Sequence, residues 1–387
     1  MGRHHSHLTS AVSILEKYHG SMPFNNFIKA YFSKEKKYGS RDRRQIAALC
    51  YAFFRSGYLL KKGDTAEKII NSVFLSEQSH SDFLAEVRPG LNAQINSELS
   101  DKFSFIGKVE ADIFPFLNEL SEDIEKDLFL KSLFIQPLLF LRVRPGKDHI
   151  VQQKLTAANI PFTIAPPDCV VLDNGTKVEE FLKINDEVVI QDRNSQRVLD
   201  YLTTAIPSSS HTLIAWDCCA GSGGKSILLH DRLRGKLRLT VADIRETILS
   251  RLHTRLHNAG VPFENSYLKD LTESGLSNSE KFDIVLCDAP CTGSGTWSRT
   301  PEQLYYFQRS KIQMYAEMQR KIINHSIKTL HKGSLFFYIT CSVFSEENEQ
   351  QANFITQTFK VKQVHLEYLK GYLDKADTMF VAVFKKS

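Results

Sequence analysis

The sequence predicts an α/β protein that ends in a mostly parallel, doubly wound sheet. From about residue 211 onward, short apolar strands alternate with helical stretches, which is the pattern of repeated βα units. Residues up to about 125 instead have the three- and four-residue apolar spacing of helices, and residues 130–190 change to short apolar runs. We expect three domains: a helical domain over 1–125, a small α/β module with its connector over 126–205, and the doubly wound domain over 206–387.

The amino-terminal region is predicted to be helical and basic. Apolar positions recur at helical spacing over residues 8–18, 26–31 and 42–60, while the histidines of residues 4–7 are expected in a frayed tail. Between Lys29 and Lys62 there are ten Lys or Arg residues, two acidic residues and interleaved aromatic rings. Such a stretch can neutralise phosphates and stack on unpaired bases. It can equally be a solvated basic face over an aromatic core.

The two later regions are predicted from their strands. In the small module, strands are expected at residues 137–144, 163–164, 169–172 and 188–191, with a helix at 148–159. In the doubly wound domain, strands are expected at 212–217, 237–243, 265–268, 282–287, 335–340 and 379–384, with helices at 224–233, 245–259 and 301–331. Ligands of open parallel sheets bind outside the carboxyl ends of the strands. We therefore expect the functional residues where these strands end.

The composition limits the class of protein and its expected location in the cell. No apolar run reaches the roughly 18 residues needed to span a bilayer, and the amino terminus lacks the apolar stretch of a signal peptide. We therefore expect a cytoplasmic protein with no membrane partner. The seven cysteines are an odd number and contain no CxxC pair, which favours free thiols and argues against a bound metal.

The first strand of the doubly wound domain ends in a glycine-rich turn, Asp217-Cys-Cys-Ala-Gly-Ser-Gly-Gly-Lys225. Small residues at such a turn let the backbone approach a ligand closely, and the following helix offers free amides. The turn is not a phosphate-binding P-loop, because Cys219 stands where the first glycine should be, and it lacks the GxGxxG spacing of a dinucleotide site. The candidate cofactor-binding residues of this turn are Cys219, Ala220, Gly221, Ser222, Gly223, Gly224 and Lys225.

Two further carboxylates follow later strands. Asp243 ends the second strand, where a carboxylate can accept both hydrogen bonds of a ribose diol. Its alternative role is to cap the helix that starts near Arg245. Asp270 lies just past the third strand and could reach an adenine amino group, although an isolated aspartate there is more often a turn or cap residue.

Two thiols and a carboxylate are expected at the same edge. Strand four runs into Asp288-Ala-Pro-Cys-Thr-Gly-Ser-Gly295, and strand five ends at Thr340-Cys341-Ser342. A thiolate that adds to carbon 6 of cytosine makes carbon 5 nucleophilic, and an acid near the ring nitrogen favours the addition. This chemistry leaves Cys291 and Cys341 as rival nucleophiles. Cys50, Cys169, Cys218 and Cys287 are interpreted as small buried hydrophobic residues.

These motifs resemble those of the Nop/Sun family of RNA cytosine-5 methyltransferases, which includes the bacterial Fmu/Sun ribosomal RNA enzymes. The resemblance covers the chain from about Pro137 to the end and, more loosely, the basic stretch from Tyr38 to Arg44. The family's cofactor loop has Ala-Pro where this chain has Gly221-Ser222. Its Asp-x-Pro-Cys and Thr-Cys motifs are similar to the segments that contain Cys291 and Cys341. The two motifs together are highly specific.

The resemblance implies a fold, a cofactor and roles for the residues. The fold would be a Rossmann-like class I methyltransferase, preceded by an RRM-like module and a helical domain that could be NusB-like. S-adenosylmethionine would be the cofactor, bound by the glycine-rich turn, Asp243 and Asp270. Cys341 would attack carbon 6, Cys291 would assist release of the product, and Asp288 would contact the base or the methionine end of the cofactor. RNA, with ribosomal RNA first, would be the partner of a monomeric enzyme without a metal.

Four alternatives remain at this point. In DNA cytosine-5 methyltransferases the Pro-Cys cysteine attacks, which would make Cys291 the nucleophile. The chain could instead be an RNA-binding assembly factor with an inactive methyltransferase domain, although both thiols, Asp243 and Asp288 are present. Transfer RNA is an alternative substrate. A nucleotide-dependent oxidoreductase is disfavoured by the absent GxGxxG motif.

Overall fold

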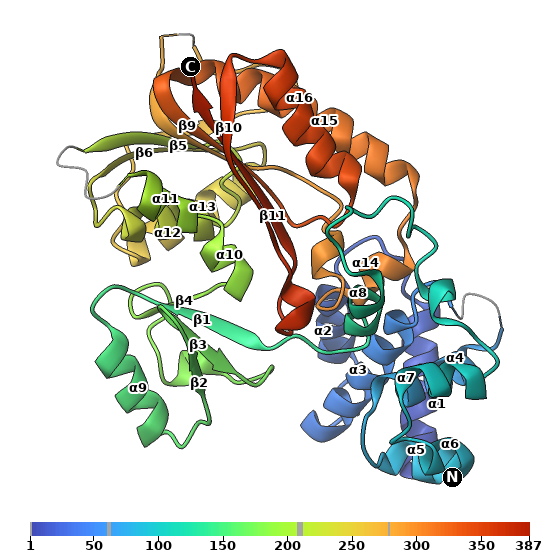
Figure 1. The fold of residues 1–387 in the computed structure, drawn as a ribbon. Helices are drawn as coiled ribbons and strands as arrows, with labels where there is room; N and C mark the ends of the chain where they lie inside the picture. Colours follow the sequence, from blue (N-terminus) through green and yellow to red (C-terminus); the bar gives the residue numbers. More distant parts are fainter. Residues whose placement is uncertain (1, 60–62, 207–211, 278) are drawn as a thin grey trace. The chain divides into compact units, whose positions relative to one another are not determined.

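A computed structural model describes residues 2–59, 63–206, 212–277 and 279–387 of the chain. The chain divides into two compact units (Figure 1). The first comprises Met1–Leu120, Glu125–Gln136 and Trp297–Arg309, and the second comprises Ser121–Ile124, Pro137–Thr296 and Ser310–Ser387. The second unit contains two separate sheets, which correspond to the predicted module and doubly wound domain. The division into three domains stays a prediction.

The first unit is helical, as its apolar spacing predicts. Its longer helices are α1 (Arg3–Glu16), α2 (Phe24–Lys34), α3 (Ser40–Arg55) and α4 (Thr65–Ser76). The shorter ones are α5 (Asp82–Val87), α6 (Pro89–Ala93), α7 (Leu99–Phe105), η1 (Glu110–Ile113) and α8 (Lys126–Ser132). The predicted helix over 42–60 therefore ends early, and its last residue, Leu60, lies outside the described residues. The expected frayed tail is wrong, because α1 includes the histidines and His7 is buried against Asp42 at 3.0 Å.

The basic stretch of the first unit covers an aromatic core. Phe24, Phe32, Phe53 and Phe54 are buried, with the rings of Phe24 and Phe54 4.9 Å apart. Lysines and arginines of the same stretch are exposed at residues 34, 36, 37, 41 and 44, whereas Lys61 and Lys62 lie outside the described residues. Rings buried in this way cannot stack on bases, so the structure supports the core interpretation for these phenylalanines.

The predicted long helix over 301–331 is wrong. The structure has two helices there, α14 (Pro301–Tyr305) in the first unit and α15 (Ser310–Ser326) in the second. The break places the Tyr306 hydroxyl 2.8 Å from the Tyr18 carbonyl oxygen and buries Trp297. Packing in the helical unit thus overrides a helical spacing that runs through the sequence without interruption.

The small sheet of the second unit is antiparallel, with the order β2-β3-β1-β4. Its strands are β1 (Leu139–Val143), β2 (Thr163–Ala165), β3 (Cys169–Leu172) and β4 (Val188–Ile190), and α9 (Asp148–Ala157) follows β1. Leu141, Val143 and Val170 of the sheet pack with Val151 and Leu155 of α9 in one core. The predicted combination of strands with one helix is confirmed.

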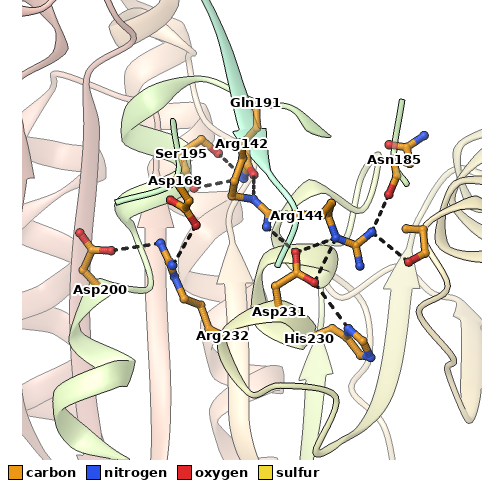
Figure 2. A network of polar contacts seen from close by, with 11 residues as sticks. Arg142, Arg144, Asp168, Asn185, Gln191, Ser195, Asp200, His230, Asp231 and Arg232 are labelled. Carbon is orange, nitrogen blue, oxygen red and sulfur yellow. Dashed lines mark hydrogen bonds and ion pairs between the residues drawn. The ribbon is translucent and has the colours of Figure 1, made fainter. Parts of the chain in front are cut away.

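A buried ionic network joins this small sheet to the larger one. Figure 2 shows Arg142 and Arg144, at the end of β1, converging on Asp231 in α12 (Gly224–Arg232). The Arg144 Nε lies 2.9 Å from an Asp231 carboxylate oxygen, and Arg144 also donates to the Ala259 carbonyl oxygen at 2.9 Å. Arg142 donates to Gln191 at 3.0 Å. Removing either arginine would leave buried partners unpaired, so the network fixes the module to the doubly wound sheet.

The large sheet has seven strands in the order β10-β11-β9-β8-β5-β6-β7. They are β5 (Leu213–Asp217), β6 (Leu237–Asp243), β7 (Asn265–Leu268), β8 (Phe282–Asp288), β9 (Leu330–Thr340), β10 (Val361–Leu369) and β11 (Met379–Lys386). Strands β9, β8, β5, β6 and β7 are parallel, and β11 and β10 extend the sheet in antiparallel fashion. The predicted mostly parallel sheet is confirmed, but the sequence reading missed β10.

Helices cover both faces of this sheet (Figure 1). Leu213 and Ala215 of β5 pack in one core with α12 and α13 (Glu246–Asn258), whereas Trp216 packs in another with α15 and α16 (Glu349–Thr358). Successive side chains of a strand point to opposite faces, which explains this alternation. Among the described residues, no helix is both long and apolar enough to cross a membrane.

Candidate active site

Four strands of the parallel sheet end at one edge and deliver the candidate residues there. Asp217, Asp243 and Asp288 are the last residues of β5, β6 and β8, and Cys341 follows the end of β9. A cavity of about 580 Å³ opens at this edge. Its lining includes Cys219, Gly221, Asp243, Asp270, Asp288, Cys291 and Cys341. The structure therefore brings the predicted carboxylates and thiols together.

A second cavity of about 310 Å³ adjoins the first, since Gly221, Asp288 and Cys341 line both. The glycine-rich turn also contributes Ala220, Ser222, Gly224 and Lys225 to the lining of this second cavity. Residues 190–192 and Ser195, which connect the small module to the sheet, also line it. Two adjoining hollows that share Cys341 and Asp288 give room for two ligands whose reacting ends meet.

The glycine-rich turn needs glycine at Gly223. This residue precedes α12 with φ +82°, and a Cβ on it would lie 2.4 Å from the Leu252 Cδ1 atom. Gly221 also has a positive φ, +51°, but a Cβ there would meet no atom within 4 Å. At Gly223 the turn therefore packs closely against Leu252 of α13. At Gly221 it is open to the cavity.

Gly223→Ala should therefore be more destabilising than Gly221→Ala. We expect the first to lower the free energy of unfolding by about 2–4 kcal/mol, the sum of backbone strain and overpacking against Leu252. The second should cost about 1–2 kcal/mol from strain alone. Urea unfolding of the two variants beside the parent protein measures the difference. Equal losses would show that Leu252 moves aside without cost.

Asp217 and Asp243 accept hydrogen bonds from the glycine-rich turn and from the helix that follows it. The Ser226 hydroxyl donates to the fully buried Asp217 carboxylate at 2.6 Å, and burial raises the pKa of Asp217 to about 7. Asp243 accepts hydrogen bonds from the backbone N–H groups of Gly221 at 3.1 Å and Arg245 at 2.9 Å. The helix after Asp243, α13, has Arg245 as its N-cap and no side-chain cap hydrogen bond, so Asp243 does not cap it. Asp243 lines the cavity, and a ribose role stays a prediction.

Asp270 closes a turn at the rim of the same cavity. One carboxylate oxygen accepts from the Thr272 hydroxyl at 2.6 Å and the Thr272 backbone N–H at 2.8 Å. These hydrogen bonds lower the pKa of Asp270 below its ordinary value. The side chain is thus a charged acceptor at neutral pH, as an adenine amino group would require.

Lys225 and Asp288 form an ion pair where the two cavities meet. The Lys225 ammonium lies 2.7 Å from the Asp288 carboxylate. Burial by itself lowers the pKa of Lys225, but the charge and the hydrogen bond of Asp288, together with the charges of Cys341 and Asp217, outweigh burial, and the net shift of the pKa is upward. The turn therefore contributes a fixed positive charge beside the thiols.

The two candidate thiols are neighbours. The Cys291 and Cys341 sulfur atoms are 3.4 Å apart, and the Gly295 backbone N–H donates to the Cys341 carbonyl oxygen at 2.8 Å. The hydrogen bond with Cys341, together with burial, raises the pKa of Cys291 well above its ordinary value. Both sulfurs line the larger cavity, so the roles of the two thiols stay as open as the motif positions left them. The described residues contain no cluster of three or more metal-ligating side chains.

The sequence reading missed Glu347, a fully buried carboxylate behind the thiols. It accepts hydrogen bonds from Thr292, Gln319 and Ser342, which lie in three separate segments. Its local sequence, Ser-Glu-Glu-Asn-Glu over residues 345–349, is polar like an exposed turn, so no pattern signals burial. Tyr315 and Met318 of α15 also line the larger cavity, and no motif in the sequence singled them out.

Comparison with known proteins finds one matching family model and several similar sequences. Residues 202–381 match the family model described as "16S rRNA methyltransferase RsmB/F". "Ribosomal RNA small subunit methyltransferase B" of Enterobacter sp. (strain 638) is 31% identical over 229 residues, which are 58% of this chain and 52% of that protein. "Probable ribosomal RNA small subunit methyltransferase B" of Bacillus subtilis (strain 168) is 29% identical over 184 residues, 47% of this chain and 40% of that protein. The chain thus spans about half or less of the length of these relatives.

Two solved structures have the same fold. The "Crystal Structure of PH0851" superposes with a TM-score of 0.73 at 18% identity and covers 97% of both chains. The structure of "NSun6 from Pyrococcus horikoshii with SFG" superposes with a TM-score of 0.59 at 15% identity, over 70% of this chain and 97% of the other. At these identities the likeness supports the architecture of the chain and not the role of any residue.

Proposed function

We propose that this chain, whose residues 202–381 match the family model of RsmB/F 16S rRNA methyltransferases, transfers a methyl group from S-adenosylmethionine to carbon 5 of a cytosine in ribosomal RNA. One observation supports this above the others. Two thiols 3.4 Å apart share a cavity with Asp243, Asp270 and Asp288 at the carboxyl edge of a parallel sheet. Ligand binding at that edge is the rule for such sheets. The two relatives compared above are both named as ribosomal RNA methyltransferases.

The residues along the larger cavity fit the cofactor. Asp243 offers a buried carboxylate to a ribose diol, and Asp270 offers a charged acceptor to an adenine amino group. The Lys225–Asp288 ion pair supplies both charges near the position of an amino-acid end. When bound, S-adenosylmethionine supplies an electrophilic methyl group. The chain itself would hold the cofactor by complementary polar groups at both ends of one cavity.

Asp243→Asn should weaken binding of S-adenosylmethionine about 10-fold or more, because hydrogen bonds to a charged acceptor contribute about 1.5–3 kcal/mol. The Gly221 and Arg245 N–H groups bond to different Asp243 oxygens, so asparagine keeps an acceptor for one of them. A urea unfolding curve beside that of the parent protein checks that the turn stays folded. Titration calorimetry measures the dissociation constant. Glu246→Gln, an exposed carboxylate three residues along the chain, is the matched control and should leave affinity unchanged. Equal affinities for all three proteins would remove the ribose role.

The thiols would carry out the covalent chemistry. The Cys341 thiolate adds to carbon 6 of cytosine, and the electron pair displaced from the ring double bond makes carbon 5 nucleophilic. The ammonium of Lys225, held by Asp288, favours the negative charge that develops on the ring. After carbon 5 is methylated, Cys291 would first give its own proton to solvent and, as a thiolate, take the proton from carbon 5. The electron pair of that C–H bond then reforms the ring double bond and expels the Cys341 thiolate, whose sulfur is 3.4 Å from that of Cys291. The two adjacent sulfurs would thus act at two adjacent ring atoms, Cys341 at carbon 6 and Cys291 at carbon 5.

Transfer of a labelled methyl group to RNA tests the proposal. The full chain should incorporate tritium from S-adenosylmethionine into unmodified small-subunit ribosomal RNA, and bisulfite sequencing should place the product at a single cytosine. Transfer RNA is the competing substrate in the same assay. An absence of label in both RNAs, with cofactor binding intact, would support an assembly factor without catalytic activity.

A further inference from the structure

Glu347 lies in the short turn η5 (Ser345–Glu347) and is fully buried. One of its carboxylate oxygens accepts from the Thr292 backbone N–H at 2.9 Å and the Gln319 side-chain amide at 3.1 Å. The other accepts from the Thr292 hydroxyl at 2.6 Å and from the Ser342 hydroxyl. A single carboxylate thus receives four hydrogen bonds from three segments of the chain.

The donors are the neighbours of the two thiols. Thr292 directly follows Cys291, and Ser342 directly follows Cys341. Gln319, on α15, also donates to the Pro290 carbonyl oxygen at 2.9 Å, on the other side of Cys291. The Glu347 carboxylate therefore connects the backbone around one sulfur to the residue beside the other. Neither Glu347 nor its three donor residues line the cavity that the two thiols share.

Fold stability alone explains this carboxylate poorly. Among the described residues Glu347 has no cationic partner in an ion pair, and burial raises its pKa despite its four hydrogen bonds. A buried charge without a cation costs free energy that hydrogen bonds offset only in part. What the carboxylate provides is a fixed geometry. An ionised carboxylate accepts hydrogen bonds along several directions, so it can join both loops at once.

We propose that Glu347 is a positioning residue that sets the spacing and orientation of Cys291 and Cys341. The proposal rests on the proposed function, in which the two sulfurs act on adjacent atoms of one cytosine. The Cys291 segment approaches the end of β9 through Gly295 and Ser294, whose contacts with the Cys341 carbonyl oxygen and the Val343 N–H are 2.8 and 2.9 Å. The hydroxyls of Thr292 and Ser342, the residues next to the sulfurs, contact each other at 3.3 Å, and Glu347 holds both of them by hydrogen bonds. A misplacement of about 1 Å at reacting groups can cost about 100-fold in rate.

Three substitutions separate spacing from charge. Glu347→Ala removes all four hydrogen bonds of the carboxylate and leaves only the direct contact of the Thr292 and Ser342 hydroxyls between these residues. It should lower kcat about 100-fold, with KM for RNA and for S-adenosylmethionine within about threefold of the parent enzyme. Glu347→Gln keeps an oxygen for the Thr292 N–H and Gln319, and its amide can donate to hydroxyls that also accept. It should keep kcat within about 10-fold of the parent value. Glu346→Ala, at a partly exposed neighbouring carboxylate, is the matched control and should behave as the parent enzyme.

The rate of disulfide formation between Cys291 and Cys341 reports their spacing without any catalysis. In the reduced full-length protein, diamide oxidises the two thiols to a disulfide and is itself reduced to the hydrazide, and peptide mass spectrometry quantifies that pair. Glu347→Ala should slow the reaction about 10-fold or more, because the sulfurs lose their alignment. Loss of the negative charge alone would speed it, since a nearby carboxylate disfavours the thiolate of Cys291. A slower reaction therefore reports geometry.

Each outcome decides the proposal. Parent values of kcat in Glu347→Ala would overturn it, and so would a lost kcat with an unchanged disulfide rate. If Glu347→Ala fails to fold, as judged by lost cofactor binding, Glu347→Asp replaces it, because its shorter side chain cannot reach both loops and should slow both reactions. If the parent enzyme transfers no methyl group to RNA, the proposed function fails, while the disulfide rates still decide the role of Glu347.

Discussion

Cys341→Ala should abolish methyl transfer to RNA. Without the thiolate no covalent bond forms at carbon 6, and carbon 5 of cytosine is too weak a nucleophile to take the methyl group. Removing a catalytic nucleophile typically costs about 10⁴-fold or more in kcat. Tritium transfer from S-adenosylmethionine measures the loss. Affinity for the cofactor should stay within about twofold of the parent value, since a thiol makes only weak hydrogen bonds.

This experiment has a matched control and one outcome that would exchange the roles of the two cysteines. Cys50→Ala changes a buried thiol of the helical unit that does not line the cavity, and this variant should transfer methyl groups as the parent enzyme does. Full activity of Cys341→Ala would contradict the assignment. If Cys291→Ala were then inactive, the arrangement would be that of the DNA enzymes, with the Pro-Cys thiol as nucleophile.

The location of the site followed from the sequence by one physical rule. Parallel strands end at the same edge, so the residues that end β6 and β8 and follow β9 had to converge, and Asp243, Asp288 and Cys341 line one cavity. The rule needs only strand ends, which short apolar runs between helices mark well. Most strands of the large sheet were predictable for the same reason, whereas β10 and the helix α16 were missed. That strand carries partly exposed, mixed polar residues at the edge of the sheet, where apolar patterning is weakest.

Features that depend on distant partners were not predictable. The break between α14 and α15 arises because residues 297–309 pack in the helical unit, against residues such as Tyr18 that are nearly 300 positions away. Glu347 looks like a surface residue until Thr292, Gln319 and Ser342 surround it. The helical start of the chain is stabilised by contacts of Arg3 and His7 with Asp42. Local patterns carry none of this information.

Cys291→Ala should trap a covalent complex between the enzyme and RNA. Cys341 remains to attack, so methyl transfer to carbon 5 proceeds, but the proton on that carbon is no longer removed by a thiol 3.4 Å from the nucleophile. Elimination then stalls, and the protein stays bound to the base. A denaturing gel with labelled RNA should show a shifted band that depends on S-adenosylmethionine. Cys291→Ser should give the same band, because a hydroxyl is far less acidic than a thiol.

The double variant Cys291→Ala with Cys341→Ala separates a covalent bond from tight binding. It should give no denaturant-resistant band, because the sulfur that forms the bond is gone. A band that survives in the double variant would place the bond on another residue. Turnover by Cys291→Ala at the parent rate, without a band, would contradict the release role. The geometry would then assign Cys291 to supporting its neighbour, because the short separation of the sulfurs allows its S–H to act on the Cys341 thiolate as well as on the base.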